Sequence, residues 1–301
     1  MSAAGRRVRR GGRLPSAGAG PGPSPGRRPG ARQRFRVAAA LAGVALALAA
    51  CGESSTVGPD PGPPPIDTVA SPDEEARAVW VTRWDWYDRP ELEALIDDIA
   101  RANFNIVYLQ VRGRADAYYE SGLEPWAHRP PVFQLGRDPG WDPLATALER
   151  AHARGLELHV WLNALIGWCT SEPIPEASPP HILVEHPDWV MVSRTGATTA
   201  DNCAWLTPGQ PGVRTRVGAV AADIARRYAV DGVHLDFIRY PNPDFSYDSA
   251  SEAAFALALE TEPALSYDDF RRRLVTATVR ETQDSLRAAD PTLPLSAAVW
   301  G

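Results

Sequence analysis

The chain has 301 residues, enough for one large domain such as an α/β barrel, and 44% of them are hydrophobic and 23% charged, as in globular proteins. Ten of its 31 basic residues precede Cys51, where there is no acidic residue, so 21 basic residues face 37 acidic ones from Cys51 onward. This acidic balance argues against nucleic acid or an anionic membrane surface as a partner, because both require a basic face.

The amino-terminal segment has the pattern of an export signal. Residues 27–36 are rich in arginine, and residues 37–50 form an apolar run that is short for a membrane span. The run ends in LAAC, Leu48 to Cys51, which resembles the lipobox of bacterial lipoproteins. A plain signal peptide or an uncleaved anchor is the alternative. We predict a signal region over residues 1–51, lipidation of Cys51, and a lipid-anchored position in a bacterial cell envelope, on the periplasmic or cell-surface face.

Residues 52–75 are rich in Pro, Gly and Ser and predict a semi-rigid tether, so a folded domain is expected over residues 76–301. Cys169 and Cys203 lie in one long connection of this domain. An exported protein allows them to form a disulfide, but nothing in the sequence fixes their separation, and the pairing stays open.

From Ala76 onward the pattern alternates between strand and helix. Hydrophobic periodicity and capping residues predict strands at 77–83, 105–112, 156–165, 232–238 and 293–300. They predict helices at 90–103, 142–155, 211–230 and 267–289. Strict alternation of this kind indicates a parallel sheet with right-handed crossovers.

The predicted connections differ in length. Those that follow the second and third strands are far longer than the usual two to six residues, and a (β/α)₈ barrel builds its active site from such loops. A doubly wound nucleotide-binding fold is the competing interpretation, but no G-x-G-x-x-G or P-loop motif follows any strand, and we expect no cofactor. We therefore predict a TIM (β/α)₈ barrel of which this sequence holds about the first five strands.

Three predicted strands alternate between an apolar face and a polar, aromatic face. Residues of the polar face are Tyr108, Gln110 and Arg112; His159, Trp161 and Asn163; and His234 and Asp236. In a barrel this face is the lumen, and Arg112, Asn163 and Asp236 are expected to converge at its mouth. Burial of unpaired polar groups is costly, which favours a functional role for them.

Two other interpretations of these residues remain open. Arg112 and Asp236 can form a buried ion pair that only stabilises the core. His159, His234 and Asp236 can supply three ligands to a metal ion, although no paired histidine motif accompanies them.

Several longer motifs resemble the glycosyl hydrolase-like family 10 domain of bacterial envelope proteins. In chain order they are RAVWVTRWDW (77–86), NIVYLQVRGRADAYYESGLEPWA (105–127), WDPLATALERAHARGLELHVWLNAL (141–165), HPDWV (186–190), LTPGQPGVR (206–214) and VDGVHLDFIRYP (230–241). The sequence departs from the family pattern at Ala78, where the family has glycine, and at Phe237, where it has a second carboxylate.

The resemblance implies a (β/α)₈ barrel that cleaves glycosidic bonds of bacterial cell-envelope polysaccharide, with peptide-free peptidoglycan glycan strands as the leading candidate. Such hydrolysis usually needs two carboxyl groups. Asp236 is the first candidate, as general acid or nucleophile, and Asp116 is the best second one within the chain. Glu124 and Asp85 are weaker candidates, and a partner beyond Gly301 is an alternative.

Polar and aromatic residues near the predicted mouth are candidates for substrate binding. They are Arg112, Trp126, His159, Trp161, Asn163, His234, Arg239 and Tyr240, with Trp84 as a further aromatic platform. Two functions of other classes remain as alternatives: a non-catalytic glycan-binding envelope lipoprotein, and a metal-dependent polysaccharide deacetylase.

Overall fold

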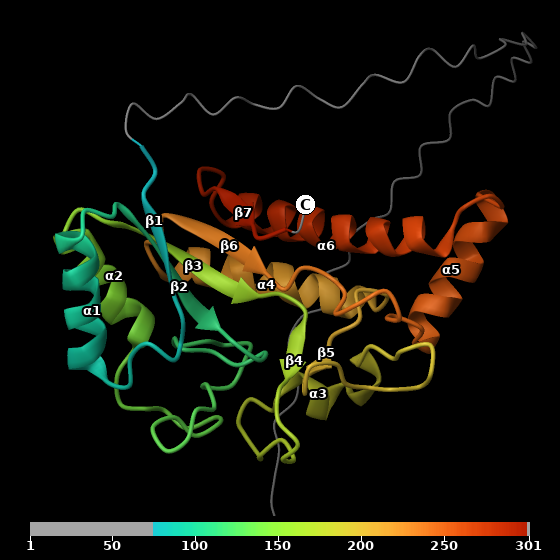
Figure 1. Cartoon of the computed structure of the whole chain (residues 1–301), viewed down its shortest axis with the longest axis horizontal. Coiled ribbons are helices and arrows are strands. Elements are labelled where there is room, and N and C mark those ends of the chain that lie inside the picture. The colour runs from blue at the N-terminus through green and yellow to red at the C-terminus, as the bar shows by residue number, and fades with distance from the viewer. Residues whose placement is uncertain (1–74, 300–301) are drawn as a thin grey trace, which may run out of the picture. The chain divides into compact units, whose positions relative to one another are not determined.

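A computed structural model describes residues 75–299. Five parallel strands form one sheet in the order β1-β2-β3-β6-β7 (Figure 1). They span Ala78–Val81 (β1), Ile106–Arg112 (β2), Glu157–Asn163 (β3), Gly232–Asp236 (β6) and Leu295–Ala297 (β7). Strands that are neighbours in the sheet also follow one another along the chain, as in a barrel wall. Each of the five strands coincides with one predicted strand.

Four helices connect these strands, at the predicted places. They are α1 (Arg89–Arg101), α2 (Pro143–Ala153), α4 (Pro211–Arg227) and α6 (Tyr267–Ala289). Local sequence explains where they begin: Asp88, Asp142 and Ser266 cap α1, α2 and α6 with their side chains, and proline lies in the first turn of α1, α2 and α4.

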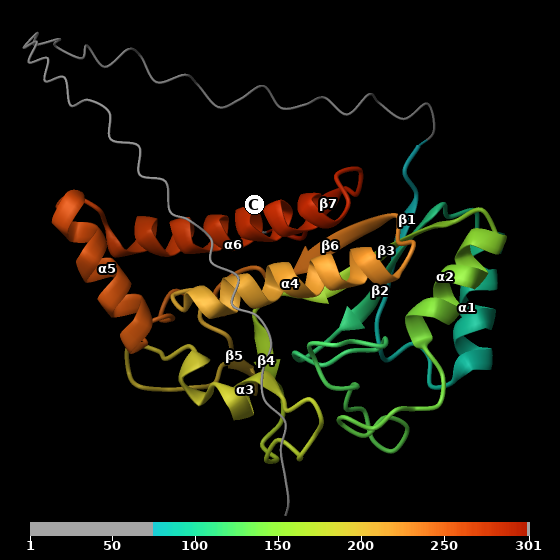
Figure 2. The ribbon, with the colours of Figure 1, turned by 180° about the vertical axis from the view of Figure 1, so that it is seen from behind.

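The helices cover one face of the sheet. Helix α4 lies in front of the strands in the view from behind (Figure 2), α2 contacts β3, α1 packs on α2 and α6 packs on α4. The apolar residues of the strands point towards these helices, as the alternation in the sequence predicts. Examples are Leu109, Val160 and Leu235, all at most 1% exposed. Each such side chain stabilises the fold by about 1.5–3 kcal/mol, so this layer is the main core.

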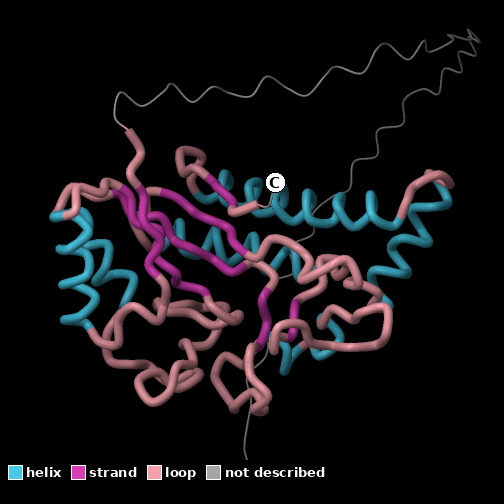
Figure 3. Tube along the Cα trace, in the orientation of Figure 1, coloured by secondary structure: helices cyan, strands magenta, loops and turns pink. Residues whose placement is uncertain are grey.

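The long connections lie at the carboxyl ends of the strands (Figure 3). The connection after β3 contains a small antiparallel sheet of β4 (Ile166–Trp168) and β5 (Ala204–Trp205), the short helix α3 (Ile182–Glu185) and the 3₁₀ turn η1 (Pro187–Trp189). The connection after β6 contains helix α5 (Ser249–Thr261). The sequence interpretation left all five of these elements as loop.

The predicted signal region, the lipidation of Cys51 and nearly all of the predicted tether lie outside the described residues. Within residues 75–299, no helix is both long and apolar enough to cross a membrane.

Candidate active site

Asp236 is the last residue of β6 and lies at the carboxyl edge of the sheet. It is half-buried, and its Oδ1 accepts a hydrogen bond from the backbone N–H of Phe237 at 2.6 Å. Phe237 has a φ of 50°, in the left-handed region that a bulky side chain rarely adopts, so the chain turns sharply directly after the carboxylate. The turn leaves Asp236 at the end of the strand, where barrel enzymes carry their catalytic groups.

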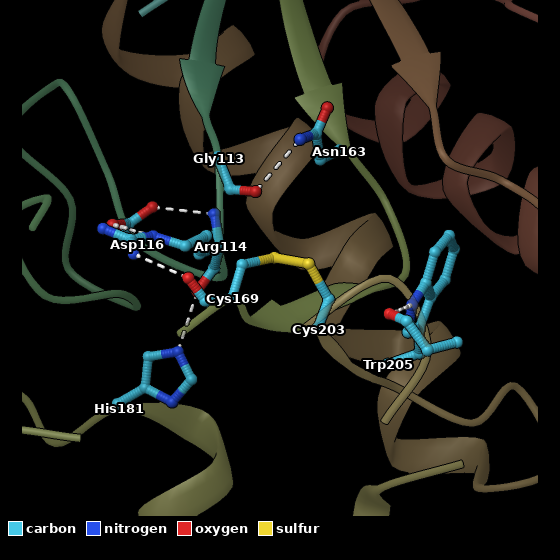
Figure 4. Close-up of a disulfide and its surroundings, with 9 residues drawn as sticks. Gly113, Arg114, Asp116, Asn163, Cys169, His181, Cys203 and Trp205 are labelled. Atoms are coloured by element: carbon cyan, nitrogen blue, oxygen red, sulfur yellow. Dashed lines mark hydrogen bonds and ion pairs between the residues drawn. A yellow bond between two sulfur atoms is a disulfide. The ribbon is translucent and has the colours of Figure 1, made fainter. Parts of the chain in front are cut away.

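Asn163 is the register partner of Asp236 at the end of β3. Its Oδ1 accepts a hydrogen bond from Trp161 Nε1 at 2.9 Å, and its Nδ2 donates to the carbonyl of Gly113 at 3.0 Å (Figure 4). Asn163 is 4% exposed and Trp161 9% exposed. Both side chains are thus engaged within the protein, and they tie the ends of β2 and β3 together next to Asp236.

Arg112 does not face the same way as Asn163. The register between β2 and β3 shifts between Gln110 and Arg112, so that Arg112 lies opposite Leu162. Such a bulge changes which side of the sheet the following residue faces. The parity argument is therefore wrong at Arg112, although it holds for Tyr108 and Gln110.

The guanidinium of Arg112 pairs with Glu124 instead of Asp236. Its Nη2 lies 2.7 Å from Oε1 of Glu124, both side chains are 1% exposed, and Nη1 donates to the carbonyls of Asn163 and Ala164. The considered Arg112–Asp236 ion pair is not formed. Because these contacts occupy Arg112 and bury Glu124, neither side chain is placed to touch a sugar in this structure.

Asp116, the predicted second carboxyl group, is 1% exposed. Its oxygens accept hydrogen bonds from the backbone N–H groups of Arg114, at 2.8 Å, and His128, at 2.9 Å. Burial opposes its ionisation, but nearby Arg114 and Arg83 and these N–H groups outweigh burial and lower the pKa of Asp116. Asp116 thus holds the loop after β2 in shape, and its burial does not support the predicted catalytic role.

His159 and His234 lie deeper on the lumen face, packed with Trp80 and Tyr108. Nε2 of His234 accepts a hydrogen bond from Trp80 at 3.4 Å, and Nδ1 lies 2.8 Å from Ser296 Oγ. Burial lowers the pKa of His234, against the opposing effect of Asp236. Both ring nitrogens of His234 are engaged in hydrogen bonds within the protein. The ring therefore packs beneath Asp236 and is not free to bind a substrate.

The metal interpretation finds no geometric support in the described residues. Within 75–299, no group of three or more His, Cys, Asp and Glu side chains is arranged to hold a metal ion. The three residues considered as ligands, His159, His234 and Asp236, belong to no such group.

Arg239 and Tyr240 follow β6 and are half-buried. The Arg239 guanidinium lies 5.4 Å from the ring centroid of Trp205, and the Tyr240 hydroxyl donates to the carbonyl of Arg271 at 3.2 Å. They line a hollow of about 610 Å³ together with residues of α6. Trp126, in the loop after β2, is also half-buried. These three residues, Asp236 and the exposed Trp84 and Asp85 are the predicted site residues that remain open to solvent.

A disulfide joins Cys169 to Cys203, with their Cα atoms 4.0 Å apart (Figure 4). It links the segments that carry β4 and β5. The carbonyl of Cys169 accepts a hydrogen bond from Arg114 Nη1 at 3.4 Å, and His181 Nε2 donates to the carbonyl of Arg114 at 2.8 Å. These contacts fasten the loop after β3 to the loop after β2.

Sequence reasoning missed three arginines at this edge: Arg83, Arg114 and Arg129. Arg83 follows β1, and the other two lie in the loop after β2. The available signal was their position, because each belongs to a segment that follows a strand and so lies at the end where barrel sites form. No strand periodicity extends into these loops to indicate which side chains face the site.

Two glycosidases are among the solved structures that share this fold. An alpha-L-fucosidase from Paenibacillus thiaminolyticus superposes with a TM-score of 0.53 and 14% identity over 75% of this chain and 33% of that chain. A beta-galactosidase from Marinomonas ef1 gives 0.51 and 17% identity over 73% of this chain and 36% of that chain. At these identities the likeness concerns the fold, and the five-stranded sheet is part of a (β/α)₈ barrel.

Residues 75–300 match the model of the family Glycosyl hydrolase-like 10, and the chain belongs to this family. It is 28% identical to "Glycosyl hydrolase YngK" of Bacillus subtilis over 79% of this chain and 47% of that protein. It is 31% identical to "Glycosyl hydrolase DigH" of Escherichia coli over 64% of this chain and 49% of that protein. The chain spans about half the length of these curated relatives.

Proposed function

We propose that this protein hydrolyses glycosidic bonds in bacterial cell-envelope polysaccharide, with peptide-free glycan strands of peptidoglycan as the substrate. The observation that carries the proposal is the half-buried carboxylate of Asp236 at the carboxyl end of β6, in a chain of a glycosyl hydrolase-like family. A lipid anchor at Cys51 is part of the same proposal, since it holds the enzyme beside its substrate.

Asp236 supplies one of the two carboxyl groups of the reaction. As general acid it protonates the leaving oxygen, and as nucleophile it attacks the anomeric carbon; water then provides the hydroxyl of the new reducing end. Of the other carboxylates considered, Asp116 and Glu124 are at most 2% exposed, whereas Asp85 is exposed in the loop after β1. Asp85 is therefore the better placed of the three to meet a substrate.

The test is hydrolysis of purified peptide-free glycan strands, followed as release of reducing ends. The wild-type protein is expected to release them, and Asp236→Asn to do so at least about a hundredfold more slowly, as loss of an acid–base group usually causes. Circular dichroism and thermal unfolding show whether the variant is folded. Asp116→Asn is the matched control for loss of a carboxylate at the same edge that does not face the substrate.

The same experiment distinguishes an enzyme from a protein that only binds glycan. Glycan that is retained without products by both wild type and Asp236→Asn indicates a non-catalytic glycan-binding lipoprotein. Hydrolysis by Asp236→Asn at the wild-type rate contradicts the assignment of this residue.

A further inference from the structure

Several arginines lie at the carboxyl edge of the sheet, although the chain from Cys51 onward is acidic as a whole. Arg83 and Arg114 lie near the single carboxylate of Asp116, Arg129 lies near Arg83, and Arg112 pairs with Glu124. In residues 75–299, neither Arg83 nor Arg129 forms an ion pair with a carboxylate. Arg83 and Arg129 therefore add positive charge at this edge that no directly paired carboxylate within residues 75–299 neutralises.

Arg129 supplies part of this charge from inside the protein. It is 1% exposed, and its guanidinium carbon lies 4.8 Å from the ring centroid of Trp86 and 5.0 Å from that of Phe133. Its Nε and Nη2 have no hydrogen-bond partner. A buried guanidinium held by aromatic faces cannot reach a ligand, but its field favours an anion bound nearby.

Arg83 is the member of this group that a ligand can reach. It is half-buried, and its backbone N–H donates to Oε1 of the buried Gln110 at 3.1 Å. The guanidinium lies across the backbone of Gly113, so closely that a Cβ there would come within 2.8 Å of Nη1. Its carbon is 4.7 Å from the ring centroid of Trp84, which is 52% exposed. Arg83 and Trp84 thus present a charged group and an open aromatic face side by side.

Contacts between neighbouring strands connect Arg83 to Asp236. Arg83 contacts Gly113, the Gly113 carbonyl binds Asn163, and Asn163 pairs in register with Asp236. From Gly113 to Asp236 this path crosses two strand spacings, about 10 Å in all, which is roughly the length of two sugar rings. A glycan that lies along this edge from Asp236 is long enough to reach Arg83 within one or two sugars.

We propose that Arg83 binds a carboxylate carried by the glycan, while Trp84 stacks on the face of the adjoining sugar ring. The proposal rests on the proposed function and names its substrate class: a glycan with single carboxylates on otherwise neutral sugars. A guanidinium matches the planar carboxylate with two parallel hydrogen bonds. The acidic balance of the chain from Cys51 onward disfavours a densely charged polyanion at the same place.

The test compares peptide-free glycan strands with the same strands after their carboxylates have been reduced to alcohols. Wild-type kcat/KM is expected to fall by about 10- to 100-fold on the reduced glycan, the usual loss for one charge-assisted contact. Arg83→Gln is expected to lose a similar factor on the intact glycan and to respond little to the reduction. Arg83→Lys should recover part of the loss, because it restores the charge without the planar fork.

Arg89→Gln is the matched control, since Arg89 is an exposed arginine that pairs with Glu93 on α1. It is expected to behave as wild type on both substrates. Equal hydrolysis of the two glycans by wild type, or equal losses on both by Arg83→Gln, overturns the carboxylate contact while the hydrolase function stands.

Binding to the Asp236→Asn protein separates this proposal from the proposed function. We expect this protein to bind the intact glycan more tightly than the reduced one, by a similar factor, without cleaving either. Equal affinities contradict the contact at Arg83, whether or not the wild-type protein is a hydrolase.

Discussion

The ion pair between Arg112 and Glu124 lies in the interior of the protein. Both groups are almost completely excluded from water, and three hydrogen bonds of 2.7–2.9 Å join them. Burial opposes the charge on Arg112, and Glu124 outweighs it, so that the pKa of Arg112 is raised. Each charge is therefore tolerated only because the other is present.

Glu124→Gln is expected to destabilise the protein by about 3–5 kcal/mol, because it leaves the Arg112 charge buried and unpaired. Urea unfolding followed by fluorescence measures this free energy. The double variant Arg112→Met, Glu124→Leu removes both charges and should recover most of the loss. A double variant that is less stable than Glu124→Gln would mean that the pair itself drives folding.

The orientation of Arg112 illustrates why part of the site was not predictable from sequence. Alternation correctly placed His159, Trp161 and His234 on the lumen face, because β3 and β6 are regular there. A one-residue bulge in β2 then reverses the facing of Arg112, and no residue type in the stretch from Gln110 to Arg112 signals it. The burial of Asp116 likewise depends on a loop whose course only the fold defines.

At the scale of elements, a disulfide holds the two ends of the long connection after β3 together. Cys169 and Cys203 are 34 residues apart, and the segment between them carries only one short helix and one 3₁₀ turn between its ends. Few regular hydrogen bonds stabilise such a segment. The disulfide therefore stabilises the fold largely by lowering the conformational entropy of the unfolded chain.

Replacing both cysteines by serine is expected to cost about 3–4 kcal/mol, the value that the loop-entropy relation gives for a loop of this length. The comparison is between unfolding free energies of the oxidised wild type and the double variant. Reduced wild type serves as the control and should match the double variant. Equal stability of oxidised and reduced protein would show that the disulfide contributes nothing.

Elements with strong periodicity were predictable, and short or evenly apolar ones were not. The covering helices have regularly spaced apolar residues, and α1, α2 and α6 also begin at side-chain caps. In α5 the apolar residues are spread around the helix, and Leu257 is 66% exposed, so no stripe marks it. Strands β4 and β5 have three and two residues, too few to show the alternation of a strand in the sequence. They pair because the connection after β3 turns back on itself.

For the molecule as a whole, buried histidines link stability to pH. Nε2 of His181 donates to the Arg114 carbonyl and Nδ1 accepts from the N–H of Leu183, so only the neutral ring satisfies both contacts. Burial lowers the pKa of His181 and of His234. The unfolded chain, with ordinary histidine pKa values near 6.5, therefore binds more protons than the folded one as pH falls below about 6.5.

The free energy of unfolding is accordingly expected to fall between about pH 6.5 and pH 5, by up to about 1.4 kcal/mol per pH unit for each such histidine. Urea unfolding at a series of pH values measures the slope. His181→Asn should reduce it, because asparagine keeps an acceptor for Leu183 but does not titrate. A slope that His181→Asn leaves unchanged would assign the pH dependence to other groups.

A role of Asp236 in the hydrolysis of a glycan by water underlies the proposed function. Its most direct test is digestion of peptide-free glycan strands in heavy-oxygen water, with mass spectrometry of the released oligosaccharides. Wild type is expected to place one heavy oxygen at each new reducing end, and folded Asp236→Asn to release at least about a hundredfold less product in the same time. Products without heavy oxygen, or equal release by Asp236→Asn, would contradict the account.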